Sequence, residues 1–77
     1  MAKTSEAVAK VQQLAMEARI RAGMVVSDHR RGNLTRLRRA HRYAMQLARL
    51  AADLASTAFE AADLLDADLR TLRNKAE

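Results

Sequence analysis

Seven arginines and no acidic residue lie between His29 and Ala52, and this run is the part of the chain best suited to bind another molecule. A guanidinium group donates paired hydrogen bonds to phosphate or carboxylate, so such a cluster suits a nucleic-acid backbone or an acidic protein surface. Residues 1–52 hold eleven basic and three acidic side chains, whereas residues 53–77 hold three basic and six acidic ones. The candidate binding residues are Arg30, Arg31, Arg36, Arg38, Arg39, Arg42 and Arg49.

Catalytic and metal-binding chemistry has little support in the sequence. His29 and His41 lack an acidic residue three or four positions further along, the spacing that makes a ligand pair or a catalytic dyad on a helix. The acidic residues 63, 66 and 68 lie in a segment without the glycine turn and alternating oxygen ligands of a calcium loop. The chain has no cysteine. We therefore expect no catalytic residues, no metal site, no cofactor and no enzyme activity.

The elements that carry these residues are predicted to be helices. The chain contains seventeen alanines and ten leucines, no proline and two glycines, and alanine and leucine have the highest helix propensities. The alternating β-branched and aromatic residues of strands are missing from the sequence. We predict an all-α chain, a single domain folded as an antiparallel helical hairpin.

Two positions for the turn compete. In the first alternative, Gly23 ends the first helix and Ser27 or Asp28 caps the second. In the second, Gly32 ends the first helix and Asn33 caps the next, which places His29 and two arginines in a C-terminal turn, where cations are favoured. We prefer the second alternative, with helices over about 5–31 and 34–74 joined by a turn at 32–33.

Apolar residues at alternating steps of three and four predict a coiled-coil seam, the row of residues that faces the other helix. In the first helix the predicted seam consists of Val8, Val11, Ala15, Ala18, Ala22 and Val25. In the second helix one row repeats every seven residues: Leu37, Ala44, Ala51, Ala58, Leu65 and Leu72. A companion row reads Ala40, Leu47, Leu54, Ala61 and then Leu69.

The second helix is longer than the first, and the difference predicts a dimer. A turn at 32–33 places Ser5 near Glu60, so about ten to fifteen residues beyond Glu60 have no partner in the same chain. Soluble monomers avoid exposed apolar patches of the kind that the leucines there would form. We therefore expect a homodimer that forms a helical bundle. The predicted contacts with the second copy or a target helix are Ala58, Ala61, Leu64, Leu65, Leu69 and Leu72.

Two hypotheses for function follow from these features. The first is a small regulator or inhibitor that acts by protein–protein contact, as many short helical chains of phages and mobile elements do, on a target with an acidic surface or an apolar groove. The second is a regulator that binds the RNA or DNA backbone through an arginine-rich hairpin tip. The chain has few of the aromatic and amide side chains that recognise bases, so such binding would depend on backbone or shape.

Membrane attachment and export are not expected. A basic amphipathic helix can lie on anionic lipid, but an alanine-rich face offers little apolar area for insertion. The first ten residues form no apolar segment of the kind found in signal peptides. Together with the absence of cysteine, this favours a cytoplasmic protein.

Overall fold

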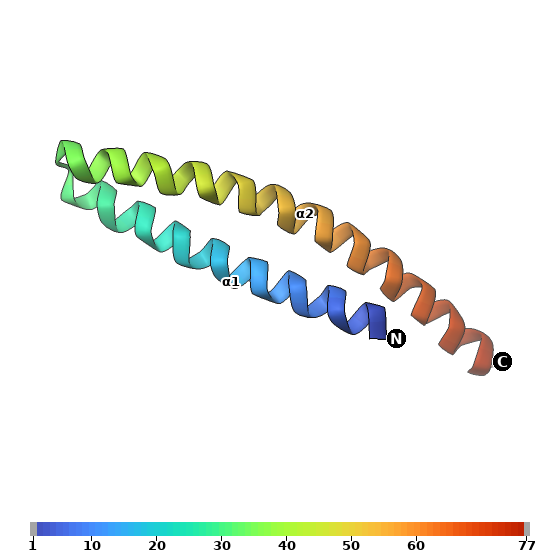
Figure 1. Cartoon of the computed structure of the whole chain (residues 1–77). Helices are drawn as coiled ribbons and strands as arrows, with labels where there is room; N and C mark the ends of the chain where they lie inside the picture. Colours follow the sequence, from blue (N-terminus) through green and yellow to red (C-terminus); the bar gives the residue numbers. More distant parts are fainter. Residues whose placement is uncertain (1, 77) are drawn as a thin grey trace.

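The computed structural model describes residues 2–76 and consists of two helices that pack against each other in antiparallel directions (Figure 1). Helix α1 spans Ala2–Arg31 and helix α2 spans Leu34–Ala76. The prediction of an all-α hairpin with a longer second helix is confirmed. The hairpin is a rod of 63 × 16 × 15 Å.

The turn is formed by Gly32 and Asn33, the second of the two alternatives. Gly32 has a φ of +68°, a left-handed conformation that suits glycine because it has no Cβ. The Asn33 side chain caps α2, since its Oδ1 accepts a hydrogen bond of 2.9 Å from the backbone amide of Arg36. Gly23 lies within α1, so it does not end the helix.

The seam of the hairpin agrees only in part with the predicted one: Val11, Ala18, Ala22 and Val25 of the predicted α1 row are half-buried. The predicted row on α2 from Leu37 to Leu72 in steps of seven is exposed along its whole length, and Val8 and Ala15 of α1 are exposed too. The residues of α1 that are buried or half-buried include Thr4, Ala7, Val11, Leu14, Ala18, Arg21, Val25 and Asp28. Those of α2 include Ala40, Tyr43, Leu47, Leu50, Leu54, Thr57, Ala61, Leu64 and Asp68. The companion row was therefore predicted correctly as far as Ala61. The other row of α2 that faces α1 is the one that contains Tyr43 and Thr57.

The unpaired end of α2 is shorter than expected. Helix α1 begins at Ala2 rather than near Ser5, and Leu64 is half-buried. Beyond Asp68, every described residue of α2 is exposed, and Figure 1 shows this end extending past the start of α1. Leu69 and Leu72 belong to this unpaired end.

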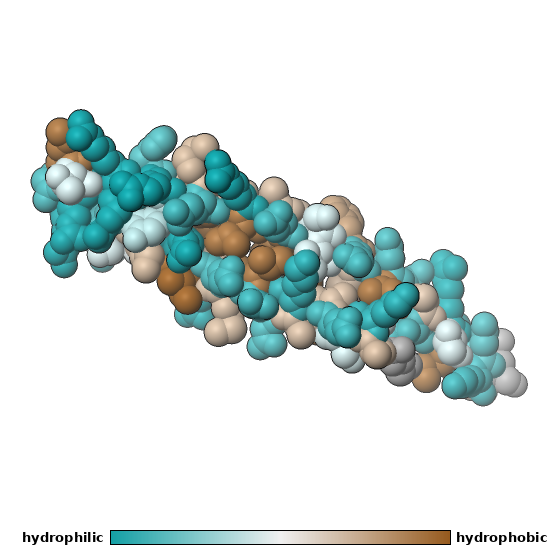
Figure 2. Space-filling model, viewed as in Figure 1, coloured by the Kyte–Doolittle hydropathy of each residue, from teal (hydrophilic) through white to brown (hydrophobic). Residues whose placement is uncertain are grey.

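The hairpin has a thin core. Its buried apolar residues are three alanines, Ala7, Ala40 and Ala61, and no larger apolar side chain among residues 2–76 is fully buried. The accessible surface is 6172 Å², whereas a compact monomer of this mass exposes about 4,700 Å². In the view of Figure 2, apolar side chains follow the line between the helices and hydrophilic ones gather around the turn. A large apolar area therefore remains in water in the single chain.

The two glycines give a matched test of the turn. Gly32→Ala should lower the free energy of unfolding by about 1–2 kcal/mol, because a Cβ is strained at positive φ. Gly23→Ala should raise it by about 0.5–1 kcal/mol, because a Cβ there meets open space and alanine favours the helix. Denaturant unfolding at one fixed protein concentration measures both changes. Equal effects of the two substitutions would contradict a turn at Gly32.

Candidate interaction surfaces

Asp28 forms the most buried polar cluster of the hairpin. It lies in the last turn of α1 and has 1% of its surface exposed. Its Oδ2 accepts a hydrogen bond of 2.8 Å from Nε of Arg39, and its Oδ1 accepts one of 2.8 Å from Nη2 of the same side chain. Nη1 of Arg36 lies 3.3 Å from Oδ1. The first two turns of α2 are thereby joined to the end of α1 next to the connecting turn.

The hydrogen bonds from Arg39 lower the pKa of the Asp28 carboxyl below its ordinary value of 3.8. Burial acts in the opposite direction, and the charges of Arg39 and Arg36 lower the pKa further. The cluster continues to Tyr43, whose ring centroid lies 5.9 Å from the Arg39 guanidinium carbon and 6.0 Å from that of Arg21, within the range of cation–π contacts. Nε of Arg21 is buried and has no hydrogen-bond partner among the described residues.

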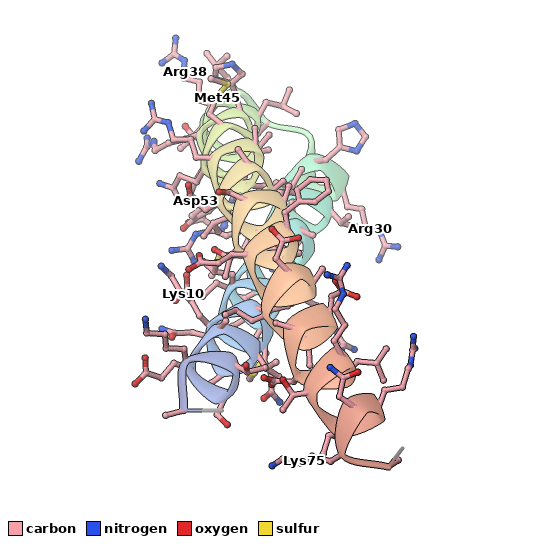
Figure 3. The ribbon with its side chains drawn as sticks, turned by 90° about the vertical axis from the view of Figure 1, so that its right-hand side faces the viewer. Lys10, Arg30, Arg38, Met45, Asp53 and Lys75 are labelled. Carbon is pink, nitrogen blue, oxygen red and sulfur yellow. The ribbon has the colours of Figure 1, made fainter. Side chains whose placement is uncertain are left out.

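The predicted arginine site is therefore divided in two by the structure. Arg36 and Arg39 are bonded to Asp28, so they hold the hairpin together rather than extending freely into solvent. The others are exposed and make no salt bridge with a described residue: Arg30, Arg31, Arg38, Arg42 and Arg49. In Figure 3, Arg38 projects away from α1, whereas Arg30 projects sideways from α1. Arg30 and Arg31 thus lie at the end of α1, whereas Arg38, Arg42 and Arg49 fall within about 40° of one another around α2 and form a basic strip on it.

The signal that was missed is the acid next to the arginine run. Asp28 is the last acidic residue before the acid-free segment and lies three positions after Val25, on the α1 seam. A carboxylate that occupies a seam position needs a cation on the facing helix. The nearest cations after the turn were those of the run itself, so this spacing could have identified Asp28 as their partner.

The two edges of the hairpin differ in chemistry. One edge has a polar groove lined by Lys10, Leu14, Asp53, Ser56, Thr57 and Glu60. Figure 3 shows Lys10 and Asp53 on this side of the hairpin. Another groove is apolar and is lined by Val8, Val11, Ala58, Ala61, Ala62 and Leu65. The apolar groove brings together the exposed predicted row of α2 and the exposed Val8 of α1.

The apolar groove is part of a larger surface on α2, which we call the alanine face. It consists of two exposed rows of residues, each with a period of seven. The first row is Leu37, Ala44, Ala51, Ala58, Leu65 and Leu72. The second is Leu34, His41, Ala48, Ala55, Ala62 and Leu69. Residues three positions apart lie about 60° apart around a helix, so the rows form one continuous strip.

The predicted dimer contacts fall into two groups. Ala61, with 5% of its surface exposed, and the half-buried Leu64 pack between α1 and α2, so they are used within the chain. Ala58, Leu65, Leu69 and Leu72 lie on the alanine face and are exposed. The prediction combined two seam residues with four outward-facing ones, because both sides of the helix are apolar there.

Residues 2–76 hold no group of three or more His, Cys, Asp or Glu side chains arranged to bind a metal ion. Neither described helix is long and apolar enough to cross a membrane. Comparison of the chain with protein-family models, with curated proteins and with solved structures gives no match in any of the three.

The Asp28 cluster predicts a defined pH dependence. Because the folded state lowers the pKa of Asp28, the ion pair stabilises the hairpin above the ordinary pKa of 3.8, and this stabilisation disappears as the pH falls through the lower folded value. We expect Asp28→Asn to have a lower melting temperature than the wild type at pH about 7, and we expect the gap between the two melting temperatures to close under strong acid. Circular-dichroism melts at several pH values, at constant protein concentration, measure the gap.

Asp53→Asn is the matched control for this experiment, because Asp53 is exposed and makes no salt bridge with a described residue. It should melt close to the wild type across the same range. A gap between wild type and Asp28→Asn that stays constant from neutral to strongly acidic pH would show that the ion pair does not stabilise the hairpin.

Proposed function

We propose that this protein is a non-enzymatic regulator or inhibitor that acts by protein–protein contact and works as a homodimer. The observation that carries the proposal is the alanine face, which runs along most of α2 and whose residues are all exposed. Leu65, near its end, keeps half of its surface exposed although it lines the apolar groove. A surface of this length and composition is suited to another helix.

The dimer is supported by the energetics of the single chain. Small domains without disulfides or metals rely on helix packing or on assembly, because a single core of this size supplies only about 3–5 kcal/mol. Here the fully buried apolar residues are alanines, and the larger side chains remain half-buried or exposed. A second copy would remove the leucines of the alanine face from water at about 25 cal/mol per Å² of apolar surface.

Binding to a nucleic-acid backbone is the second candidate function. It is favoured by the five exposed arginines at the end of α1 and in the first half of α2, which make no salt bridge with a described residue. Protein contact remains our first choice because the exposed arginines are divided between two helices, whereas the alanine face is a single strip along α2. In either function, the exposed arginines would contact an acidic partner.

Assembly is tested by Leu65→Asp. The substitution removes apolar contact and adds a charge in each copy, so the dimer dissociation constant should rise by at least about tenfold, while the helix content is retained. Sedimentation equilibrium measures the constant, and circular dichroism measures helix content. Met16→Asp, at an equally exposed apolar position of α1 away from the alanine face, should leave the dimer intact. A monomeric wild type at micromolar concentration would refute the homodimer.

The choice between protein and nucleic acid is tested by fluorescence anisotropy with labelled duplex DNA and structured RNA. Under the proposal, binding is weak and disappears between low and physiological salt. Tight binding that persists at physiological salt, and is lost in the double variant Arg42→Glu, Arg49→Glu, would establish the second candidate instead. The variant Arg73→Glu, Lys75→Glu makes the same change of net charge at the far end of α2 and serves as the control.

A further inference from the structure

The alanine face is nearly symmetrical about its own middle. From Leu37 to Leu65, its first row has leucine at both ends and three alanines between them, centred on Ala51. Its second row has leucine at both ends, at Leu34 and Leu69, and is centred between Ala51 and Ala52. A helix whose contact face looks the same from both ends can pair with an antiparallel copy of itself around a two-fold axis.

We infer that two copies pair through α2 in antiparallel directions, with the two-fold axis beside Ala51 and Ala52. This inference rests on the homodimer proposed above. It specifies which face of α2 forms the contact, the relative direction of the two α2 helices and the register in which they align. In this register, Ala51 lies opposite Ala51 of the second copy, and Ala44 lies opposite the second copy's Ala58. The leucines at the ends meet in the same way, Leu37 with Leu65 and Leu34 with Leu69.

The row next to the alanine face supports this polarity through its charges. It consists of Arg38, Met45, Ala52, Phe59 and Asp66, and all five residues are exposed. The row is centred on Ala52, so in the antiparallel register each Arg38 lies opposite an Asp66 of the other copy. Asp66 already has an Arg70 partner at 3.1 Å, but that pair is exposed on one helix and leaves a carboxylate oxygen available.

The same row places two exposed apolar side chains together. Phe59 has 75% of its surface exposed, the largest value among the big apolar residues, and it lies opposite Met45 of the second copy. A thioether against an aromatic ring is a favourable contact. A parallel pair would place the two copies of this row on opposite sides of the interface, so these contacts favour the antiparallel arrangement.

The surface area of the hairpin is consistent with such a pair. One chain exposes 6172 Å², about 1,500 Å² more than a compact monomer of this mass, and a standard interface buries about 800 Å² on each partner. The central alanines allow the two α2 helices to approach closely. Leu37 of the second copy then lies over the apolar groove, whose lining includes Leu65 and Val8.

Cysteine cross-linking tests the register, because the natural chain has no cysteine. Three single variants at exposed alanines of one row are needed: Ala44→Cys, Ala51→Cys and Ala58→Cys. Ala51→Cys should form a disulfide-linked dimer under mild oxidation. Ala44→Cys and Ala58→Cys should cross-link poorly alone and efficiently when the two chains are mixed and refolded together, as measured on non-reducing gels.

The possible outcomes test the antiparallel register and the proposed homodimer separately. Efficient self-cross-linking of both Ala44→Cys and Ala58→Cys would show a parallel pair and overturn the inference. A dimer by sedimentation without any of these cross-links would show that another face pairs, and the inference would fail while the homodimer stands. A monomer by sedimentation would refute the homodimer itself.

A charge exchange gives a second measurement that does not depend on cysteine. Arg38→Asp should weaken the dimer by roughly three- to tenfold, since it places two acids together on each side of the axis. Adding Asp66→Arg to this variant should restore the wild-type dissociation constant, because the pair is then re-formed in reverse. A double variant that dimerises no better than Arg38→Asp would overturn the proposed register.

Discussion

Two helices can cover only one strip of each other, and this constraint governs the rest of the structure. In this hairpin the strip is narrow, since the residues fully enclosed between the helices are alanines, threonines and Asp28. Small side chains let α1 and α2 approach closely but remove little apolar area from water. Apolar residues on the other sides of each helix must remain exposed or be covered by another molecule. The exposed surfaces of the chain are therefore where its function should be sought.

The ion pair of Asp28 with Arg39 selects which strip of α2 is covered. Turning α2 until the alanine face met α1 would carry the Arg39 guanidinium away from a carboxylate that is almost fully enclosed. A buried charge that loses its partner is strongly unfavourable. The pair therefore disfavours other rotations of α2 as well as stabilising this one. By holding α2 in this rotation, it leaves the alanine face outward.

The sequence was sufficient to predict the two helices and the turn, because Gly32 and Asn33 have local preferences that act without the rest of the fold. The seam was mispredicted for a physical reason. Apolar residues cover several adjacent rows of α2, so the spacing alone fits more than one row. The true seam also contains Tyr43, Thr57 and Asp28, and a search for apolar residues passes over them. Which row faces α1 depends on a contact between helices, and single-helix periodicity does not contain that information.

Charge is distributed unevenly along α2. Residues 34–52 carry five arginines and no acid, the acids begin at Asp53, and the last turn is basic again. Asp28 accounts for Arg36 and Arg39 but not for the exposed Arg38 or for Asp66. The proposed antiparallel second copy would account for both, because it would place the acidic half of one α2 beside the basic half of the other. The uneven distribution of charge within one chain would then favour antiparallel pairing between two chains.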